Sequence, residues 1–216
     1  MSAPAERGGR IRALDVTGAA ALAHLTRGLA ELAALGVTYF KLDFLYAGAL
    51  EGRRAEELGG IGAYRLGMRA IRDAIGEGAT IVACGAPLLP TVGLAAAVRV
   101  GPDLAPNWEP PDGDVGQPPG RPAHLATRAR ALMRGRWWNN DPDCLLARPE
   151  VGGRGRRARQ LREMGGMASS GDLLEDLDGW GLGVTRRLMR PSYPEPALPV
   201  GPIPVTRVGA RRPPGP

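Results

Sequence analysis

Apolar residues recur every three or four positions in part of the chain, which is the spacing of an amphipathic helix. The clearest stretch covers 19–35, where leucines at positions 22, 25, 29, 32 and 35 share one face, and a glycine follows as a stop signal. Other stretches indicate further helices. They cover 62–75, 122–134, 155–164 and 173–189.

Between these helices lie short runs of β-branched, aromatic and small apolar residues, which predict buried strands. The runs cover 37–44, 80–84, 95–100, 136–139 and 166–170. Strands that alternate with helices form a parallel sheet covered by those helices. We therefore expect an α/β fold of the (β/α)8 TIM-barrel type.

The predicted strands are too few for a complete barrel. Such a barrel has eight strands and typically about 250 residues, whereas this chain has 216 residues. We expect an incomplete barrel of roughly five C-terminal βα units over 13–189. A frayed N-terminus at 1–12 and a disordered, Pro- and Gly-rich tail at 190–216 are expected to flank it.

The composition narrows the class of protein. Hydrophobic residues make up 44% of the chain and charged residues 23%, as in an ordinary globular protein. No apolar run is long enough for a transmembrane helix, and the N-terminal residues lack the apolar core of a signal peptide. Two cysteines exclude a disulfide scaffold and a four-cysteine zinc site. We expect a cytoplasmic protein with no membrane partner.

The net charge of +6 and the pI of about 10.1 suggest a nucleic-acid partner. The strongest basic run, 154–159, has no interleaved aromatic residues and matches no recognised motif, so a solvated helix face is the better interpretation. The abundance of Arg, Ala and Gly is typical of GC-rich codon usage. Lys41 is the only lysine in the chain, and its compact ammonium suits a tight polar pocket better than a guanidinium.

Polar residues follow the predicted strands, where the rim of a barrel carries its active site. Lys41 and Asp43 are two positions apart and face the same side of a strand. The lysine favours an ionised carboxylate, which can act as a nucleophile. The alternative for this pair is an ion pair that caps the strand.

Two further motifs follow later strands. Arg99 and Asp103 flank a Gly-Pro turn, which is either part of a site or a surface turn with a salt bridge. Asp141 lies in an Asn-Asp-Pro-Asp segment that follows Trp137 and Trp138. Either tryptophan could offer an apolar face to a sugar; the alternative is an Asx turn beside buried tryptophans.

Other kinds of enzyme site are poorly supported. The sequence contains no phosphate-binding P-loop and no nucleophile elbow. The two histidines, His24 and His124, lie far apart on predicted helices, which argues against a histidine metal site or triad.

Four segments match the rim of a known family in the same order along the chain. They are 39–50 (YFKLDFLYAGAL), 84–88 (CGAPL), 99–103 (RVGPD) and 140–145 (NDPDCL). Together they resemble the melibiase-type α-galactosidases, glycoside hydrolase family thirty-six. The first resembles the nucleophile segment of that family, and the others resemble successive rim segments.

The resemblance implies a retaining hydrolase of terminal α-galactosides. The resemblance implies Asp43 as the nucleophile and Asp103 as the acid/base. A retaining glycosidase needs one ionised and one protonated carboxyl group, and Lys41 beside Asp43 fits the ionised one. The resemblance implies no metal ion and no organic cofactor. The residues it implies at the sugar are Lys41, Cys84, Arg99, Trp138 and Asp141.

The sequence also departs from the family. The segment 14–17 resembles the region after the third barrel strand, and nothing upstream matches the first three strands. We therefore expect open sheet edges that favour association or oligomers, and weak activity or none. The alternatives are a catalytically inactive barrel fragment and an Arg-rich nucleic-acid-binding protein.

Overall fold

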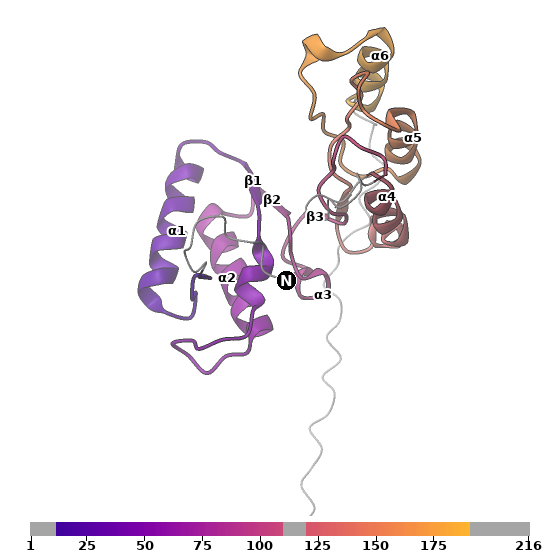
Figure 1. Cartoon of the computed structure of the whole chain (residues 1–216). Helices are drawn as coiled ribbons and strands as arrows, with labels where there is room; N and C mark the ends of the chain where they lie inside the picture. The colour runs from indigo at the N-terminus through magenta and orange to yellow at the C-terminus, as the bar shows by residue number, and fades with distance from the viewer. Residues whose placement is uncertain (1–11, 110–119, 191–216) are drawn as a thin grey trace, which may run out of the picture.

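The computed structural model describes residues 12–109 and 120–190. Helices and parallel strands alternate along the chain, as the sequence predicts (Figure 1). The strands are β1 (Tyr39–Leu42), β2 (Thr80–Ala83), β3 (Ala97–Arg99) and β4 (Asn139–Asp141). The helices are α1 (Ala19–Ala34), α2 (Gly60–Ile75), α3 (Leu88–Thr91), α4 (Gly120–Ala129), α5 (Arg154–Met164) and α6 (Gly179–Leu188), with 3-10 turns at Leu45–Ala49, Ala131–Met133 and Leu174–Asp176.

The four strands of the described residues form one parallel sheet in the order β1-β2-β3-β4. The register pairs Lys41 with Val82 and Arg99 with Asp141. Sequential order and parallel direction are those of part of a TIM-type barrel, so the predicted fold class is confirmed. Because the strands are parallel, their carboxyl ends all lie at one edge of the sheet, which we call the carboxyl edge.

Two of the predicted strands are placed differently in the structure. β4 begins at Asn139 rather than at 136, because a turn at Gly135, with a φ of 69°, occupies the preceding residues. The predicted strand at 166–170 forms only one isolated bridge, between Leu145 and Ser170. Gly165 and Gly166 have φ angles of 59° and 103°, which break the extended conformation there.

Separate apolar clusters lie against β1 and β2 and between α5 and α6. Near β1 and β2, Phe40 and Ile81 pack with Tyr64, Met68 and Ile71 of α2. This is the amphipathic face that the sequence of α2 predicts. On the other side, α5 and α6 enclose a cluster around Leu145, Ala147, Ala158, Leu161, Leu177 and Val184. Figure 1 shows α1 and α2 beside β1 and the helices α4 to α6 beyond β3.

The first strand lies at an edge of the sheet. Tyr39 is 52% exposed, and no residue of α1 is buried. Helices of the described ranges are too short or too polar to cross a membrane. The frayed N-terminus expected at 1–12 and the disordered tail expected at 190–216 lie outside the described residues, except for Arg12 and Arg190.

Candidate active site

Each strand delivers one polar residue to the carboxyl edge. Asp43 follows β1 directly and Cys84 follows β2 directly, whereas Arg99 and Asp141 are the last residues of β3 and β4. Asp103 lies four residues beyond Arg99 and bonds to it. The structure therefore brings these five predicted site residues to one edge of the sheet.

The turn after β1 presents Asp43 to solvent. The backbone N–H of Phe44 donates to Asp43 Oδ1 at 2.7 Å, and Phe44 has a left-handed φ of 54°. This conformation ends the strand, since a non-glycine residue rarely adopts it within one. Lys41, two residues earlier on the same face of the strand, is also exposed. Both charged groups are accessible to a ligand at this edge.

Cys84 lies behind Asp43 and is 4% exposed. Burial, together with a hydrogen bond to Asp43, raises the pKa of the Cys84 thiol to about 11. The thiol is therefore protonated at neutral pH. Backbone bonds from Leu45 and Tyr46 to the carbonyls of Cys84 and Gly85 hold the two loops together.

Arg99 joins three carboxylates at the other end of the carboxyl edge. Its side chain is 6% exposed, and its Nη1 lies 2.8 Å from Asp103 Oδ1. Its Nε lies 3.1 Å from Asp141 Oδ2 and its Nη2 3.0 Å from Asp143 Oδ1. Burial opposes the charge of the guanidinium, but Asp141 and Asp143 outweigh it and raise the pKa of Arg99. Arg99 is a permanent cation that orients the acidic groups around it.

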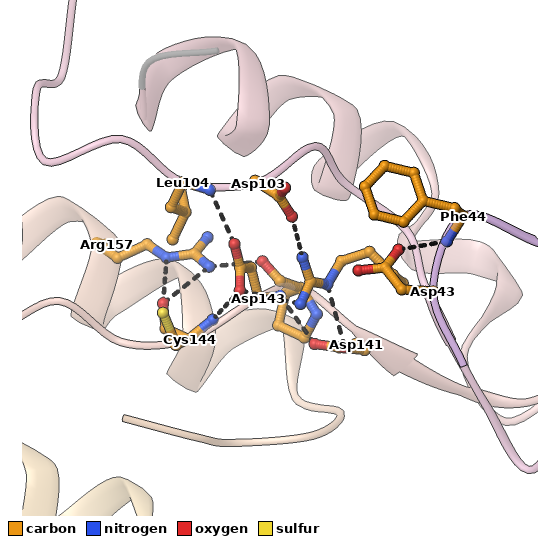
Figure 2. A network of polar contacts seen from close by, with 10 residues as sticks. Asp43, Phe44, Asp103, Leu104, Asp141, Asp143, Cys144 and Arg157 are labelled. Atoms are coloured by element: carbon orange, nitrogen blue, oxygen red, sulfur yellow. Dashed lines mark hydrogen bonds and ion pairs between the residues drawn. The ribbon is translucent and has the colours of Figure 1, made fainter. Parts of the chain in front are cut away.

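Asp143 is the residue at which the loops after β3 and β4 meet (Figure 2). Its Oδ2 accepts the backbone N–H of Leu104 and its Oδ1 the backbone N–H of Cys144, each at 2.8 Å. Its own N–H donates to Asp141 Oδ1 at 2.9 Å. Both carboxylate oxygens of Asp141 are therefore bonded within the protein.

Arg157 of α5 supports this loop from below the surface. It is 4% exposed and donates to the carbonyl oxygens of Pro142 and Cys144, which flank Asp143. It also donates to Gln160 Oε1 at 3.0 Å. Burial lowers the pKa of Arg157 to about 10, so the group remains charged at neutral pH.

Trp138 does not lie with the other predicted site residues. It is 3% exposed, packs against Ala83 and Val98, and donates its indole N–H to Asn140 Oδ1 at 3.0 Å. The reason is the later start of β4: Trp138 precedes the first residue of the strand, whereas the carboxyl edge begins after Asp141. The ring has no face open to a sugar, so the stacking role expected for it is not supported.

The sequence did not single out Asp143 or Arg157 as site residues. The sequence shows the Asp-Pro-Asp spacing of residues 141–143, and that spacing could have suggested that both carboxylates share a partner. In the structure the shared partner is Arg99. The bond from Leu104 to Asp143 spans 39 residues, so no local pattern contains it.

The basic run at 154–159 is only partly a solvated face. Arg157 is buried, and Arg154 pairs with Asp178 at 2.8 Å and lies over the ring of Trp180. Arg156 and Arg159 are exposed. Arg156 also lies over the ring of Trp108, so three of the four arginines in this run make internal contacts.

In the described ranges, no group of three His, Cys, Asp or Glu side chains is placed to hold a metal ion. The carboxylates of Asp103, Asp141 and Asp143 converge on a guanidinium instead. What the arrangement offers chemically is an exposed carboxylate at one end of the carboxyl edge and another, Asp103, at the other.

No protein-family model matches the chain. Among solved structures, it is similar to the α-galactosidase TtGalA from Thermus thermophilus in complex with stachyose, with 29% identity and a TM-score of 0.69. That match covers 81% of this chain and 39% of the Thermus chain. The same enzyme in complex with p-nitrophenyl α-D-galactopyranoside matches with 29% identity and a TM-score of 0.67, over 82% of this chain and 37% of that one. The described residues therefore have the fold of part of a family thirty-six-like α-galactosidase.

Proposed function

We propose that this chain carries the catalytic carboxylates of a retaining glycoside hydrolase that acts on terminal α-galactosides. The observation that carries the proposal is that Asp43, Arg99 and Asp103 all lie along the carboxyl edge of a sheet that resembles part of an α-galactosidase. The Thermus structures contain stachyose and an aryl α-galactoside, so the same sugar class is proposed here.

In the first step, a carboxylate oxygen of Asp43 forms a bond to the anomeric carbon while the glycosidic C–O bond breaks. The leaving oxygen takes the proton of Asp103, and the aglycone departs as an alcohol. In the second step, Asp103 removes a proton from water, and the water oxygen attacks the anomeric carbon. The ester bond to Asp43 breaks, and galactose is released with its configuration retained.

Both aspartates are exposed at the carboxyl edge, where a substrate can reach them. The backbone N–H of Phe44 donates to Asp43 and orients it, and Cys84 lies close enough for Asp43 to raise the pKa of its thiol. The ion pair with Arg99 uses Oδ1 of Asp103, and 81% of that side chain is exposed. Oδ2 is therefore accessible to a substrate, which supports the proposed role of Asp103. Lys41 offers an exposed ammonium on the face of Asp43, suited to a sugar hydroxyl.

The test is hydrolysis of p-nitrophenyl α-galactoside by the full chain and by Asp43→Ala. We expect weak hydrolysis that falls by about a thousandfold or more in the variant, because no covalent intermediate can form. Azide should restore part of the rate, since a small anion can occupy the space of the lost carboxylate. Asp73→Ala is the matched control, because Asp73 is an exposed aspartate on α2.

Activity that survives Asp43→Ala would contradict the assignment of the nucleophile. Absence of hydrolysis, and of a covalent adduct by intact mass after incubation with a fluorinated galactosyl fluoride, would instead support a catalytically inactive barrel module.

A further inference from the structure

We propose that Asp143 is a positioning residue that holds the acid/base Asp103 at the glycosidic oxygen. The inference rests on the proposed function for the role of Asp103, but its structural part concerns contacts that exist whether or not the chain is active. Asp143 itself is not placed to transfer the proton, because both of its oxygens are bonded and its side chain is 13% exposed.

Asp143 reaches Asp103 by two routes. The first is through the main chain: Oδ2 of Asp143 accepts the N–H of Leu104, the residue directly after Asp103, at 2.8 Å. The second is through the side chain: Oδ1 lies 3.0 Å from Nη2 of Arg99, whose Nη1 lies 2.8 Å from Asp103. One carboxylate thus fixes both the backbone and the carboxyl group of an otherwise exposed residue.

Asp143 is itself held rigidly. Its φ of 76° is left-handed, and its N–H is bonded to Asp141. Arg157 donates to the carbonyls on both sides of it, at Pro142 and Cys144. A non-glycine residue persists in this conformation only where its surroundings determine it. The fixed point for Asp103 is therefore a largely buried residue of another loop and not the turn that carries Asp103 itself.

Such positioning matters for proton transfer, because a displacement of about 1 Å at a reacting group can cost about a hundredfold in rate. Substrates depend on it unequally. A glycoside with a poor leaving group needs the proton, whereas one with a strongly acidic aglycone departs without it. Loss of a residue that positions the acid should therefore slow hydrolysis of the first kind of substrate and leave hydrolysis of the second nearly unchanged.

The experiment compares Asp143→Ala with the unaltered chain on phenyl and dinitrophenyl α-galactosides. We expect kcat/KM to fall by about a hundredfold for the phenyl glycoside and by less than about threefold for the dinitrophenyl glycoside. Asp143→Asn keeps the shape of the side chain but not the charge opposite Arg99. Its kcat/KM for the phenyl glycoside should lie between those of the unaltered chain and Asp143→Ala, and it replaces the alanine variant if that variant does not fold. Equal losses on both substrates would overturn the proposal.

Asp178→Ala is the matched control. Asp178 also accepts a backbone N–H, from Gly181 at 2.7 Å, and also pairs with an arginine, Arg154, at 2.8 Å. It caps α6 and is not part of the candidate site. Its loss should affect the two substrates by the same factor.

Hydrogen exchange of the Leu104 amide provides a readout that needs no activity. We expect exchange to be about tenfold faster in Asp143→Ala and unchanged in Asp178→Ala, because only the first removes the acceptor of this N–H. Unchanged exchange in Asp143→Ala would overturn the positioning role even in an active enzyme. A chain that hydrolyses neither galactoside would refute the proposed function, and the amide exchange would still decide whether Asp143 holds the Asp103 loop.

Discussion

The two ends of the carboxyl edge hold their aspartates differently. At the β1 end, Asp43 is exposed and accepts a hydrogen bond from the next residue of its own chain. At the β3–β4 end, Asp141 and Asp143 are largely buried around Arg99, which also holds Asp103. The β3–β4 end is a network of buried ion pairs that links three sequence segments, whereas the β1 end is an exposed turn joined to the next loop by backbone hydrogen bonds.

Exposed groups at this edge can react with a ligand, whereas the buried ion pairs hold the loops in place. Ion pairs with little access to water are strong only while every partner is present, because a buried charge left alone is costly. Loss of the buried cation at the β3–β4 end should therefore reduce folding stability strongly, whereas loss of an exposed group at the β1 end should leave stability nearly unchanged. Substitutions at the two ends test that difference.

The largest expected effect on stability is at Arg99. Arg99→Met leaves the carboxylates of Asp141 and Asp143 without their cation, and we expect the free energy of unfolding to fall by about 3–5 kcal/mol. Urea denaturation followed by circular dichroism measures it. Lys41→Met removes the other cation at this edge, but Lys41 is exposed, so a change within about 0.5 kcal/mol is expected. Similar losses in the two variants would remove the distinction between the two ends.

A smaller effect is expected from the buried thiol at the β1 end. The pKa of Cys84 is raised to about 11, from an ordinary value of 9.0, by burial and by Asp43. A raised pKa means that the folded state holds the proton more tightly than the unfolded state. The stabilisation is complete below pH 9 and is lost as the pH rises toward 11.

The free energy of unfolding falls as the pH rises toward 11. In Cys84→Ser this fall should be smaller by up to about 2 kcal/mol, because the titrating thiol is absent. The measurement is urea denaturation at a series of pH values between 8 and 11, on both proteins. Cys144 is a second thiol whose pKa is raised to about 11, chiefly by burial, so Cys144→Ser is the comparison at the other end. Identical pH profiles for the unaltered chain and Cys84→Ser would contradict the burial of that thiol.

The smallest expected effect on stability is at the open edge of β1. Tyr39 is 52% exposed on a strand whose outer side is free for pairing in the described structure, and such edges favour association. Tyr39→Lys should change the unfolding free energy by less than about 1 kcal/mol and reduce self-association in sedimentation velocity. A monomer at all concentrations before the substitution would contradict the predicted association.

Local patterns were sufficient for most of the fold. The strands that end at Leu42 and Ala83 are short apolar runs closed by polar residues, and the sequence places both correctly. It fails at 166–170, where paired glycines with positive φ prevent an extended strand. Apolar content alone does not reveal that conformation.

The candidate site was predictable only in part, for a related reason. Residues that follow strands in a parallel sheet must meet, so Asp43, Cys84 and Arg99 could be grouped from their order. The sequence misplaces Trp138 because β4 starts three residues later than expected. Trp138 therefore lies before the amino end of the strand and not near its carboxyl end. Asp143 was missed because its partners come from distant segments.

The contact of Arg157 with Pro142 and Cys144 makes the site dependent on a helix that contributes nothing to its surface. The loop that carries Asp143 can keep its shape only while α5 is docked. Partial unfolding that detaches α5 would therefore release the loop that positions Asp103, while β1, β2 and their apolar cluster stay folded. Catalytic competence and global folding are thus separable, and inactivation on warming is expected to begin at α5, before the chain as a whole unfolds.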